Sequence, residues 1–186
     1  MPKRSASHLV WIDMEMSGLD PDRDVILEIA TLITDEQLVL LAEGPVFAVR
    51  QPKRILDRMD RWNTEHHTSS GLVDRVLRSE VTATEAEAQT LAFVKKFCLV
   101  RKSPLCGNSV YQDRRFLQHY MPELEKFLHY RNVDVSTIKE LVRRWYPNGA
   151  KPPEKKHAHL ALDDIRESIE ELRFYRDQYF PKGDGK

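Results

Sequence analysis

The sequence predicts a single α/β domain with a mixed central sheet, in which an antiparallel meander is joined by parallel strands and flanked by helices. Three strand-like segments follow one another within the first fifty residues, and their short connections are typical of antiparallel pairing. Beyond them, segments of helical period alternate with short apolar segments, which predicts parallel strands joined by helices. The 186 residues suit one domain over 1–186, with short flexible tails expected at about 1–7 and 181–186.

The first part of the chain supplies the predicted meander. Residues 9–12 form a continuous apolar run, LVWI, that is typical of a buried strand. Residues 25–34 and 38–49 predict the second and third strands, with a turn at 35–37 between them. The polar segment 50–70 follows and is predicted to be irregular.

The rest of the chain is predicted to alternate between helices and short strands. Helices are expected at about 71–78, 84–99, 111–128, 137–145 and 160–179, and strands at 105–110 and 133–135. Two residue pairs at the start of the second helix have capping-box spacing, Thr84 with Glu87 and Thr82 with Glu85. Pro122 predicts a break in the third helix, and Pro and Gly predict a loop over 147–157.

Charge and composition limit the functions that the chain can perform. The 29 basic and 29 acidic residues give a net charge of zero, which favours a small, locally bound substrate over a long tract of phosphates. No apolar stretch approaches the ~20 residues that cross a bilayer, so no membrane partner is expected. The amino-terminal residues show no separate apolar region of a secretory signal. The two cysteines lack metal-ligand spacing, so we expect a reducing, cytoplasmic setting.

Asp13 and Glu15 form an acidic pair at the end of the first predicted strand. Residues two apart on a strand share a face, so both carboxylates point the same way from an otherwise apolar element. Two adjacent like charges near a core are costly unless a cation lies between them, and a divalent metal is such a cation. The alternative is that the pair lies at a solvent-exposed strand end or pairs with Arg and Lys.

Asp113 lies near the start of the helix predicted at 111–128. The residues three, four and seven positions later are Phe116, Leu117 and Tyr120, so Asp113 projects from the apolar, inward face of this helix. A carboxylate on a buried face favours a functional role. The alternative is a first-turn Asp stabilised by the helix dipole, a role that does not require the buried face.

His159, Asp163 and Asp164 surround the start of the last predicted helix. At about 100° per residue, Asp164 flanks the apolar stripe that contains Ile165 and Ile169, whereas Asp163 points to solvent. Asp164 is therefore the better metal-ligand candidate. His159 is too far round a regular helix to share that face, so it must lean in from the preceding loop or first turn. Taken alone, a His at this position is more typical of a cap or a surface residue.

Four carboxylates and one histidine make up the predicted catalytic set: Asp13, Glu15, Asp113, Asp164 and His159. Carboxylate ligands without cysteine suit hard divalent ions such as Mg²⁺ or Mn²⁺ rather than structural zinc. Two such ions about 4 Å apart can clamp a phosphodiester while a water attacks in line. A histidine that is neutral near pH 7 can take the proton of that water. Ser109, Ser136 and the cysteines show no evident triad, which disfavours acyl transfer.

These residues closely resemble the three sequence motifs of the DEDDh 3′→5′ exonucleases, which have a ribonuclease H-like fold. The Asp-x-Glu motif corresponds to Asp13 and Glu15, the second motif to Asp113, and the His-x4-Asp motif to His159 and Asp164. Longer segments resemble the oligoribonucleases of this family over about residues 8–180: IDMEMSGLDPDRDVILEIATL, WNTEHHTSSGL, CGNSVYQDRRFLQHYMPELE, HYRNVDVSTIKELVRRW and HLALDDIRESIEELRFYR. The resemblance implies a cytoplasmic homodimer with two metal ions, Mg²⁺ or Mn²⁺. It also implies hydrolysis of very short single-stranded RNA from the 3′ end, with dinucleotides favoured, to nucleoside 5′-monophosphates.

The same resemblance implies which residues hold the substrate. Leu19 and Trp62 would wedge and stack against the bases. The 5′ phosphate would be held, and the site closed behind it, by Ser109, His67, Ser136, Tyr130 and Arg131, the last two from the other subunit. The residues alone leave simpler alternatives open. Trp62 could pack in the core, Tyr130 and Arg131 could be an ordinary strand-edge pair, and the basic loop around Lys155 could simply be solvated.

Two other functions are compatible with the sequence. A broader DEDDh exonuclease, trimming tRNA or single-stranded DNA, would be expected to carry a basic track, which the neutral charge disfavours. A non-catalytic nucleic-acid-binding protein would be expected to have lost a metal ligand, whereas all four carboxylates and the histidine are present. Both are therefore less favoured than the function that the resemblance to oligoribonucleases implies, a hydrolase whose activity falls steeply as the substrate lengthens.

Overall fold

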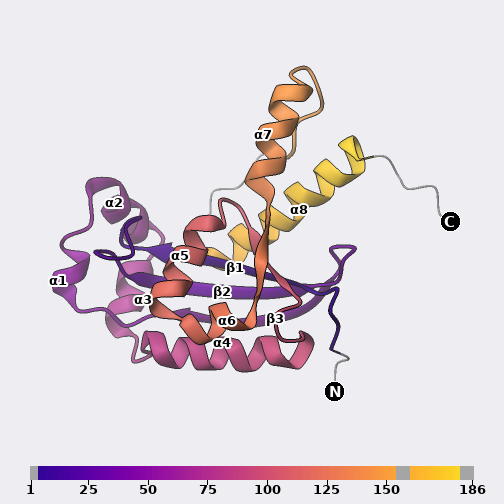
Figure 1. Ribbon diagram of the computed structural model, residues 1–186. Helices are drawn as coiled ribbons and strands as arrows, with labels where there is room; N and C mark the ends of the chain where they lie inside the picture. Colours follow the sequence, from indigo (N-terminus) through magenta and orange to yellow (C-terminus); the bar gives the residue numbers. More distant parts are fainter. Residues whose placement is uncertain (1–3, 154–159, 181–186) are drawn as a thin grey trace.

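The computed structural model describes residues 4–153 and 160–180, which form a five-stranded sheet with helices on both faces (Figure 1). The strand order is β3-β2-β1-β4-β5. The strands are β1 (Leu9–Met16), β2 (Ile26–Thr34), β3 (Leu40–Ala48), β4 (Pro104–Gly107) and β5 (His129–Asp134). The first three pair antiparallel as a meander, and β4 and β5 extend the sheet in parallel with β1. The predicted mixed α/β sheet is confirmed.

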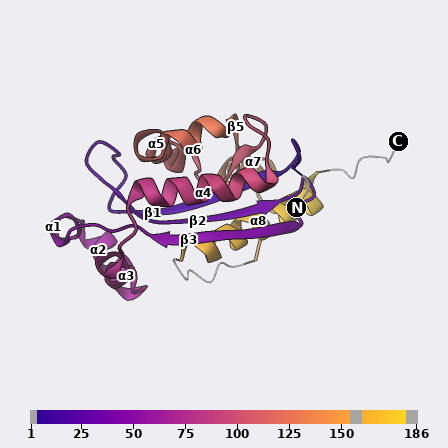
Figure 2. The ribbon, with the colours of Figure 1, turned by 90° about the horizontal axis from the view of Figure 1, so that it is seen from below.

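Two helical layers cover the sheet, one on each face (Figure 2). One layer consists of α4 (Ala83–Phe97), α5 (Tyr111–Tyr120) and α6 (Pro122–Phe127), and the other of α8 (Ala161–Tyr179), against which α7 (Val135–Trp145) packs. Three short helices lie together at one end of the sheet: α1 (Lys53–Leu56), α2 (Arg61–Ser69) and α3 (Leu72–Arg78). Among residues 4–153 and 160–180, no helix has both the length and the apolar character needed to span a membrane.

Side chains alternate along β1 and separate the core into two clusters. The even-numbered side chains from Val10 to Met16 are buried against α4, α5 and α6. Trp11 points to the other face, where it packs in a second cluster with α7 and α8. Asp13 and Glu15 follow Trp11 on that same side of the strand. The alternation therefore places both carboxylates on the face that α8 covers.

The prediction of an irregular segment over 50–70 is wrong, because this segment contains α1 and α2. α2 is polar along most of its length, so it lacks the apolar period that reveals a helix in a sequence. Its start is instead marked by a cap, since the Asp60 carboxylate accepts a hydrogen bond from the Asn63 backbone N–H at 2.7 Å.

The capping box of α4 is formed by Thr82 and Glu85, and not by the alternative pair of Thr84 and Glu87. Glu87 is buried and turns toward α6. Its carboxylate accepts hydrogen bonds from two backbone N–H groups in the first turn of α6, at 2.6 and 3.0 Å. Glu87 therefore caps a different helix from the one that contains it. The predicted break at Pro122 is confirmed, because α5 ends before it and α6 begins there.

The two parallel strands have different bounds from the predicted ones. β4 ends at Gly107 rather than at residue 110, because Ser109 already adopts a left-handed backbone conformation with φ of +50°. β5 begins at His129 rather than at residue 133, since this edge strand is largely exposed and lacks the apolar run that marks a buried strand. Asp134 ends β5 and caps α7 by accepting a hydrogen bond from the Ser136 backbone N–H at 2.9 Å.

Candidate active site

Three carboxylates converge where β1 meets the start of α8. Carboxylate oxygens of Asp13, Glu15 and Asp164 all lie within 4.8 Å of one another. Asp13 and Glu15 share one face of β1, and Asp164 lies in the first turn of α8, where the helix dipole stabilises an anion. The structure thus brings together three of the residues that sequence reasoning assigned to one metal site.

The pKa of Glu15 shows the electrostatic cost of this convergence. Burial raises it to about 7, with the negative charges of Asp164 and Glu28 contributing and the guanidinium of Arg75 opposing. A cation between the carboxylates would favour their charged forms and remove this cost. The clustered oxygen donors therefore fit a hard divalent metal ion.

Asp113 approaches the same stretch of β1 from the side. β4 has already ended at Gly107, so the backbone N–H of Met14 lies beyond the paired part of these two strands. The Asp113 carboxylate accepts a hydrogen bond from this N–H at 3.1 Å. Burial raises the pKa of Asp113, and the charge of Glu15 adds to the effect. Asp113 therefore borders the three-carboxylate cluster through the peptide group that follows Asp13.

Glu28 and Arg75 lie beside the carboxylates, and sequence reasoning missed both. Glu28 is buried and lies directly opposite Glu15 across β1 and β2. Its carboxylate pairs with the Arg75 guanidinium at 2.9 Å and accepts a hydrogen bond at 3.4 Å from the Ala161 N–H, where α8 begins. Glu28 is the only charged residue in the run VILEIATLI, and this isolation is the signal that could have identified it.

Of the two histidines that the sequence predicts at the site, the structure describes His67. His67 is buried on α2, where its Nε2–H donates to the Met16 carbonyl at 2.9 Å and its Nδ1 lies 3.9 Å from the Glu15 carboxylate. Burial lowers the pKa of His67, which favours the neutral ring. These contacts place it next to a carboxylate, and its role at the 5′ phosphate stays a prediction. His159 lies outside the described residues, and its role as general base also stays a prediction.

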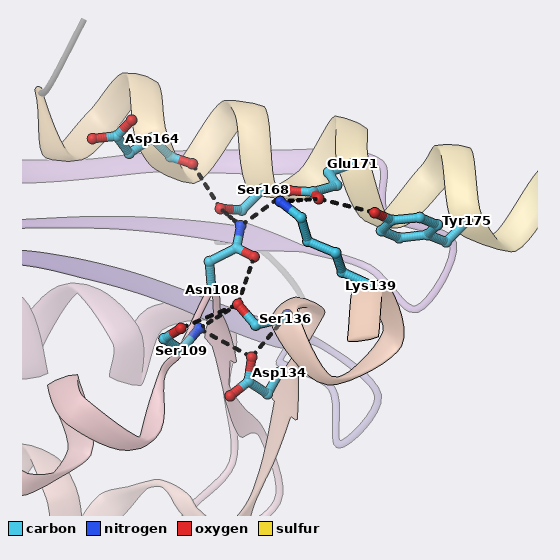
Figure 3. A network of polar contacts seen from close by, with 9 residues as sticks. All are labelled: Asn108, Ser109, Asp134, Ser136, Lys139, Asp164, Ser168, Glu171 and Tyr175. Atoms are coloured by element: carbon cyan, nitrogen blue, oxygen red, sulfur yellow. Dashed lines mark hydrogen bonds and ion pairs between the residues drawn. The ribbon is translucent and has the colours of Figure 1, made fainter. Parts of the chain in front are cut away.

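Ser109 and Ser136 lie together between the end of β4 and the start of α7 (Figure 3). The Ser109 backbone N–H donates to Ser136 Oγ and to the Asp134 carboxylate, each at 3.0 Å, and the two hydroxyl oxygens are 3.2 Å apart. The left-handed backbone of Ser109 costs a non-glycine residue roughly 1–3 kcal/mol, and such strain clusters at functional sites. A hollow of about 390 Å³, lined by both serines, opens beside them.

Leu19 and Trp62 are large apolar side chains that face solvent, with 70% and 62% of their surface exposed. The Leu19 carbonyl accepts a hydrogen bond from the Arg115 guanidinium at 3.2 Å, which fixes its loop to α5. Trp62 stacks on His66 with the ring centroids 4.2 Å apart. The core-packing alternative for Trp62 is therefore wrong, and both side chains present surface of the kind on which bases stack.

Tyr130 and Arg131 lie toward the far end of β5. This strand pairs with β4 so that Asp134 lies beside Gly107, close to the serines. At ~3.3 Å per residue, Tyr130 is roughly 13 Å along the strand from Asp134. Tyr130 is 73% exposed, and the Arg131 guanidinium lies 5.4 Å from the centre of its ring. The pair is therefore separated from the serine cluster of its own chain by most of the length of β5.

The sequence and the fold of this chain match a known class of protein. A family model described as Exonuclease (RNase T) matches residues 10–172. Two solved structures have a similar fold: exonuclease I from Methylocaldum szegediense (TM-score 0.65, 20% identity, 94% of this chain and 41% of that chain) and E. coli exonuclease I in complex with a 5cy-dT13 oligonucleotide (TM-score 0.71, 16% identity, 93% and 41%). This chain spans less than half the length of those proteins, and the likeness shows the ribonuclease H-like fold.

Relatives with higher sequence identity show to which group of exonucleases the chain belongs. The oligoribonuclease of Acinetobacter baylyi is 55% identical over 182 residues, which cover 98% of this chain and 100% of the relative. The oligoribonuclease of Pseudomonas aeruginosa is 58% identical over 176 residues, or 95% and 98%, and that of Coxiella burnetii is 58% identical over 172 residues, or 92% and 94%. The chain belongs to the exonuclease family and, within it, to the oligoribonucleases.

Proposed function

We propose that this protein is a 3′→5′ exoribonuclease that hydrolyses very short RNA, dinucleotides above all, to nucleoside 5′-monophosphates. The observation that carries the proposal is the convergence of the Asp13, Glu15 and Asp164 oxygens within 4.8 Å. It is supported by oligoribonucleases that are 55–58% identical over nearly the whole chain. The net charge of zero suits a short substrate with few phosphates.

The four carboxylates Asp13, Glu15, Asp113 and Asp164 would hold two divalent ions, Mg²⁺ or Mn²⁺. Such ions, when bound, activate water and stabilise the negative charge that develops as a phosphodiester is cleaved. Two contacts support this ligand set: β1 and α8 bring three of the carboxylates together, and the fourth, Asp113, accepts a hydrogen bond from the Met14 N–H that would orient it. Glu28, which pairs with Arg75 and lies opposite Glu15 on β2, would help to hold Glu15 in place.

Other side chains would accept the proton of the attacking water and bind the substrate. His159 would accept the proton of the attacking water from its position shortly before Asp164 in the sequence. Leu19 and Trp62 would stack against the bases with their exposed surfaces. Ser109, Ser136 and His67 would hold the 5′ phosphate.

The protein would act as a homodimer in a reducing, cytoplasmic setting. Tyr130 and Arg131 are distant from the serine cluster of their own chain, so a second copy would bring them to the 5′ phosphate. β5 lies at the edge of the sheet, where it is accessible to a second chain. A phosphate enclosed from both sides would leave a longer RNA no exit. The buried cysteines Cys98 and Cys106 are free thiols, as is typical of a reducing compartment.

A substrate-length series tests the proposal. RNA of two to about seven nucleotides, carrying a 5′ label, is hydrolysed with Mg²⁺ or Mn²⁺ and kcat/KM is compared across lengths. The matched variants are Asp164→Ala, which removes a carboxylate of the cluster, and Asp163→Ala, whose carboxylate instead pairs with Arg166 at 3.1 Å. A sharp maximum at the dinucleotide supports the proposal. Flat or rising activity with length indicates a general exonuclease, and binding without hydrolysis indicates a nucleic-acid-binding protein.

A further inference from the structure

A chain of hydrogen bonds runs from the serine cluster to the helix that carries Asp164 (Figure 3). The Asn108 side-chain oxygen accepts a hydrogen bond from Ser136 Oγ at 3.1 Å. The Asn108 amide nitrogen donates to Ser168 Oγ at 2.6 Å, and Ser168 Oγ donates in turn to the backbone carbonyl of Asp164 at 2.8 Å. One amide side chain therefore connects the Ser109–Ser136 pair with the first turn of α8.

Glu171 and Lys139 give this amide a defined orientation. The Glu171 residue is 3% exposed, and one of its carboxylate oxygens lies 3.4 Å from the Asn108 amide nitrogen. The other oxygen accepts a hydrogen bond from the Tyr175 hydroxyl at 3.1 Å and lies 3.4 Å from Lys139 Nζ. With a carboxylate on the α8 side, Asn108 must turn its NH₂ group toward it, because the reverse orientation would place two oxygens together. The Asn108 oxygen is then directed at Ser136.

A buried carboxylate is tolerated only when it is paired and hydrogen-bonded. Lys139 on α7 supplies a positive charge to Glu171 on α8, and Asn108 supplies a donor from the loop after β4. Three segments that are distant in the sequence are thus joined at Glu171. This network lies between the acidic cluster and the serines but contains none of the residues assigned so far to metal or substrate apart from its ends.

We propose that Asn108 is a positioning residue, oriented by Glu171, that holds the Ser109–Ser136 hydroxyls and the Asp164 helix in one arrangement. The inference rests on the proposed function, in which the serines meet the 5′ phosphate and Asp164 holds metal. Asn108 is not among the residues proposed to contact either ligand, but its hydrogen bonds with Ser136 and Ser168 connect it to residues that are. Loss of its amide therefore weakens 5′-phosphate binding and metal binding together.

The main test measures binding without turnover. The ligands are a dinucleotide with a non-hydrolysable methylenephosphonate linkage, with and without a 5′ phosphate, and Mn²⁺ alone on metal-free protein, each titrated by calorimetry. Asn108→Ala is expected to raise the Kd of the 5′-phosphorylated ligand about tenfold and that of the 5′-hydroxyl ligand less than about twofold. It is also expected to raise the Kd of Mn²⁺ severalfold. Unchanged values, or an equal loss for both dinucleotides, would overturn the inference.

Two further variants separate the two arms of the network. Ser168→Ala removes the hydroxyl that joins Asn108 to the Asp164 carbonyl but leaves the contacts of Asn108 with Ser136 and Glu171, so the Kd of Mn²⁺ rises while the preference for the 5′ phosphate remains. Asn108→Asp keeps the shape of the side chain but loses the donated hydrogen bond and repels Glu171, so it repeats the effect of Asn108→Ala if the alanine variant folds poorly. A Ser168→Ala variant that loses the 5′-phosphate preference contradicts the proposed order of contacts.

The role of the Glu171 charge is tested by rescue. Lys139→Met removes a positive charge from beside this buried carboxylate, so we expect a lower Tm and weaker binding of both ligands. Adding Glu171→Gln removes the charge and restores both readouts toward those of the unmodified protein. Lys53→Met, which breaks an exposed pair between α1 and the residue that follows it, Asp57, is the control and leaves both unchanged. A double variant no better than Lys139→Met overturns the role of Glu171.

Failure of this inference is distinguishable from failure of the proposed function. If the unmodified protein shows no preference for the 5′-phosphorylated dinucleotide, the assignment of the serines is wrong, and the substrate arm of the inference is overturned with it. If the preference is present and Ser136→Ala abolishes it while Asn108→Ala does not, only the positioning role of Asn108 is overturned.

Discussion

Asp113 and Arg114 are neighbours on α5 and both are buried, yet their surroundings differ. The Arg114 guanidinium donates hydrogen bonds at 2.8 Å to the Asn132 side chain, the Glu125 carboxylate and the His129 carbonyl. Its charge is thereby matched by acceptors from α6 and β5. A buried charge satisfied in this way stabilises the fold and has little left to offer a ligand.

The carboxylate next to it in the sequence has the opposite environment. Asp113 accepts a backbone N–H, but the charges that influence it include another carboxylate, Glu15, and its pKa is raised. The pKa of Glu15 is raised as well, in part by Asp164. A buried charge surrounded by groups of opposite charge is therefore structural, whereas a group of buried carboxylates is suited to binding a cation.

The largest effect is expected when one carboxylate of the acidic cluster is removed. Asp164→Ala should lower kcat/KM for a dinucleotide by about 10³-fold or more, equivalent to ~4 kcal/mol of barrier. The Tm of the metal-free protein should stay level or rise, because one member of a repelling group is removed. Steady-state kinetics and thermal melting check both statements. Asp163→Ala is the control, and near-normal turnover by Asp164→Ala would refute the metal-site assignment.

The next largest effect is expected when the buried charge of Arg114, which its acceptors satisfy, is removed. Arg114→Met leaves Glu125 and two other acceptors without their donor, so we expect the free energy of unfolding to fall by about 3–5 kcal/mol. The kcat of the folded protein should stay within about threefold, since Arg114 does not face the acidic cluster. Chemical denaturation and active-site titration measure the two quantities. Arg143→Met, which breaks an exposed pair with Glu140, should cost at most about 1 kcal/mol.

A smaller effect is expected at the exposed ring of Trp62. Trp62→Ala should raise KM for a dinucleotide about tenfold, because a stacked base is worth roughly 1–3 kcal/mol. Tm should change little, since the indole is exposed. Trp62→Phe should recover most of the affinity by restoring an aromatic face. An unchanged KM in Trp62→Ala would show that the bases bind elsewhere.

The smallest expected effect is the dependence of Tm on pH in the metal-free protein. The pKa of Glu15 is raised from 4.5 to about 7 in the fold, so its contribution to stability is present below about pH 4.5 and is lost as the pH rises through 7. Metal-free protein should therefore lose about 3 °C or more of Tm between pH 5 and pH 8 through this group. Added Mn²⁺ should raise Tm more at pH 8 than at pH 5. Glu15→Gln should reduce the pH dependence, with the raised pKa of Asp113 accounting for the remainder, and a dependence that persists in full would assign it to groups other than Glu15.

Much of the fold was predictable because its elements differ in local pattern. The apolar run of β1 and β2 and the period of α8 are visible in the sequence, and they suffice to place Asp13, Glu15 and Asp164 on facing surfaces. α2 was missed because a polar helix held by a cap has no such pattern. β5 was placed too late because an exposed edge strand has no apolar run.

The supporting residues of the site were not predictable in the same way. Glu28 pairs with Arg75, and Asn108 with Ser168 and Glu171, only after the chain has brought distant segments together. Neither pairing has a spacing that a sequence pattern could reveal. Isolated polar residues within apolar segments are the only local trace of such networks, and Glu28 within β2 is an example.

The register that places Glu15 directly opposite Glu28 also affects how the sheet opens. Like charges facing each other across two strands weaken that part of a ladder. In the absence of a cation, backbone amides at this end of β1 and β2 should therefore exchange hydrogen with solvent sooner than those where Leu9 pairs with Thr34. Binding of a divalent ion would slow that exchange. A divalent ion held by the carboxylates would thereby also stabilise the pairing of β1 with β2 at this end of the sheet.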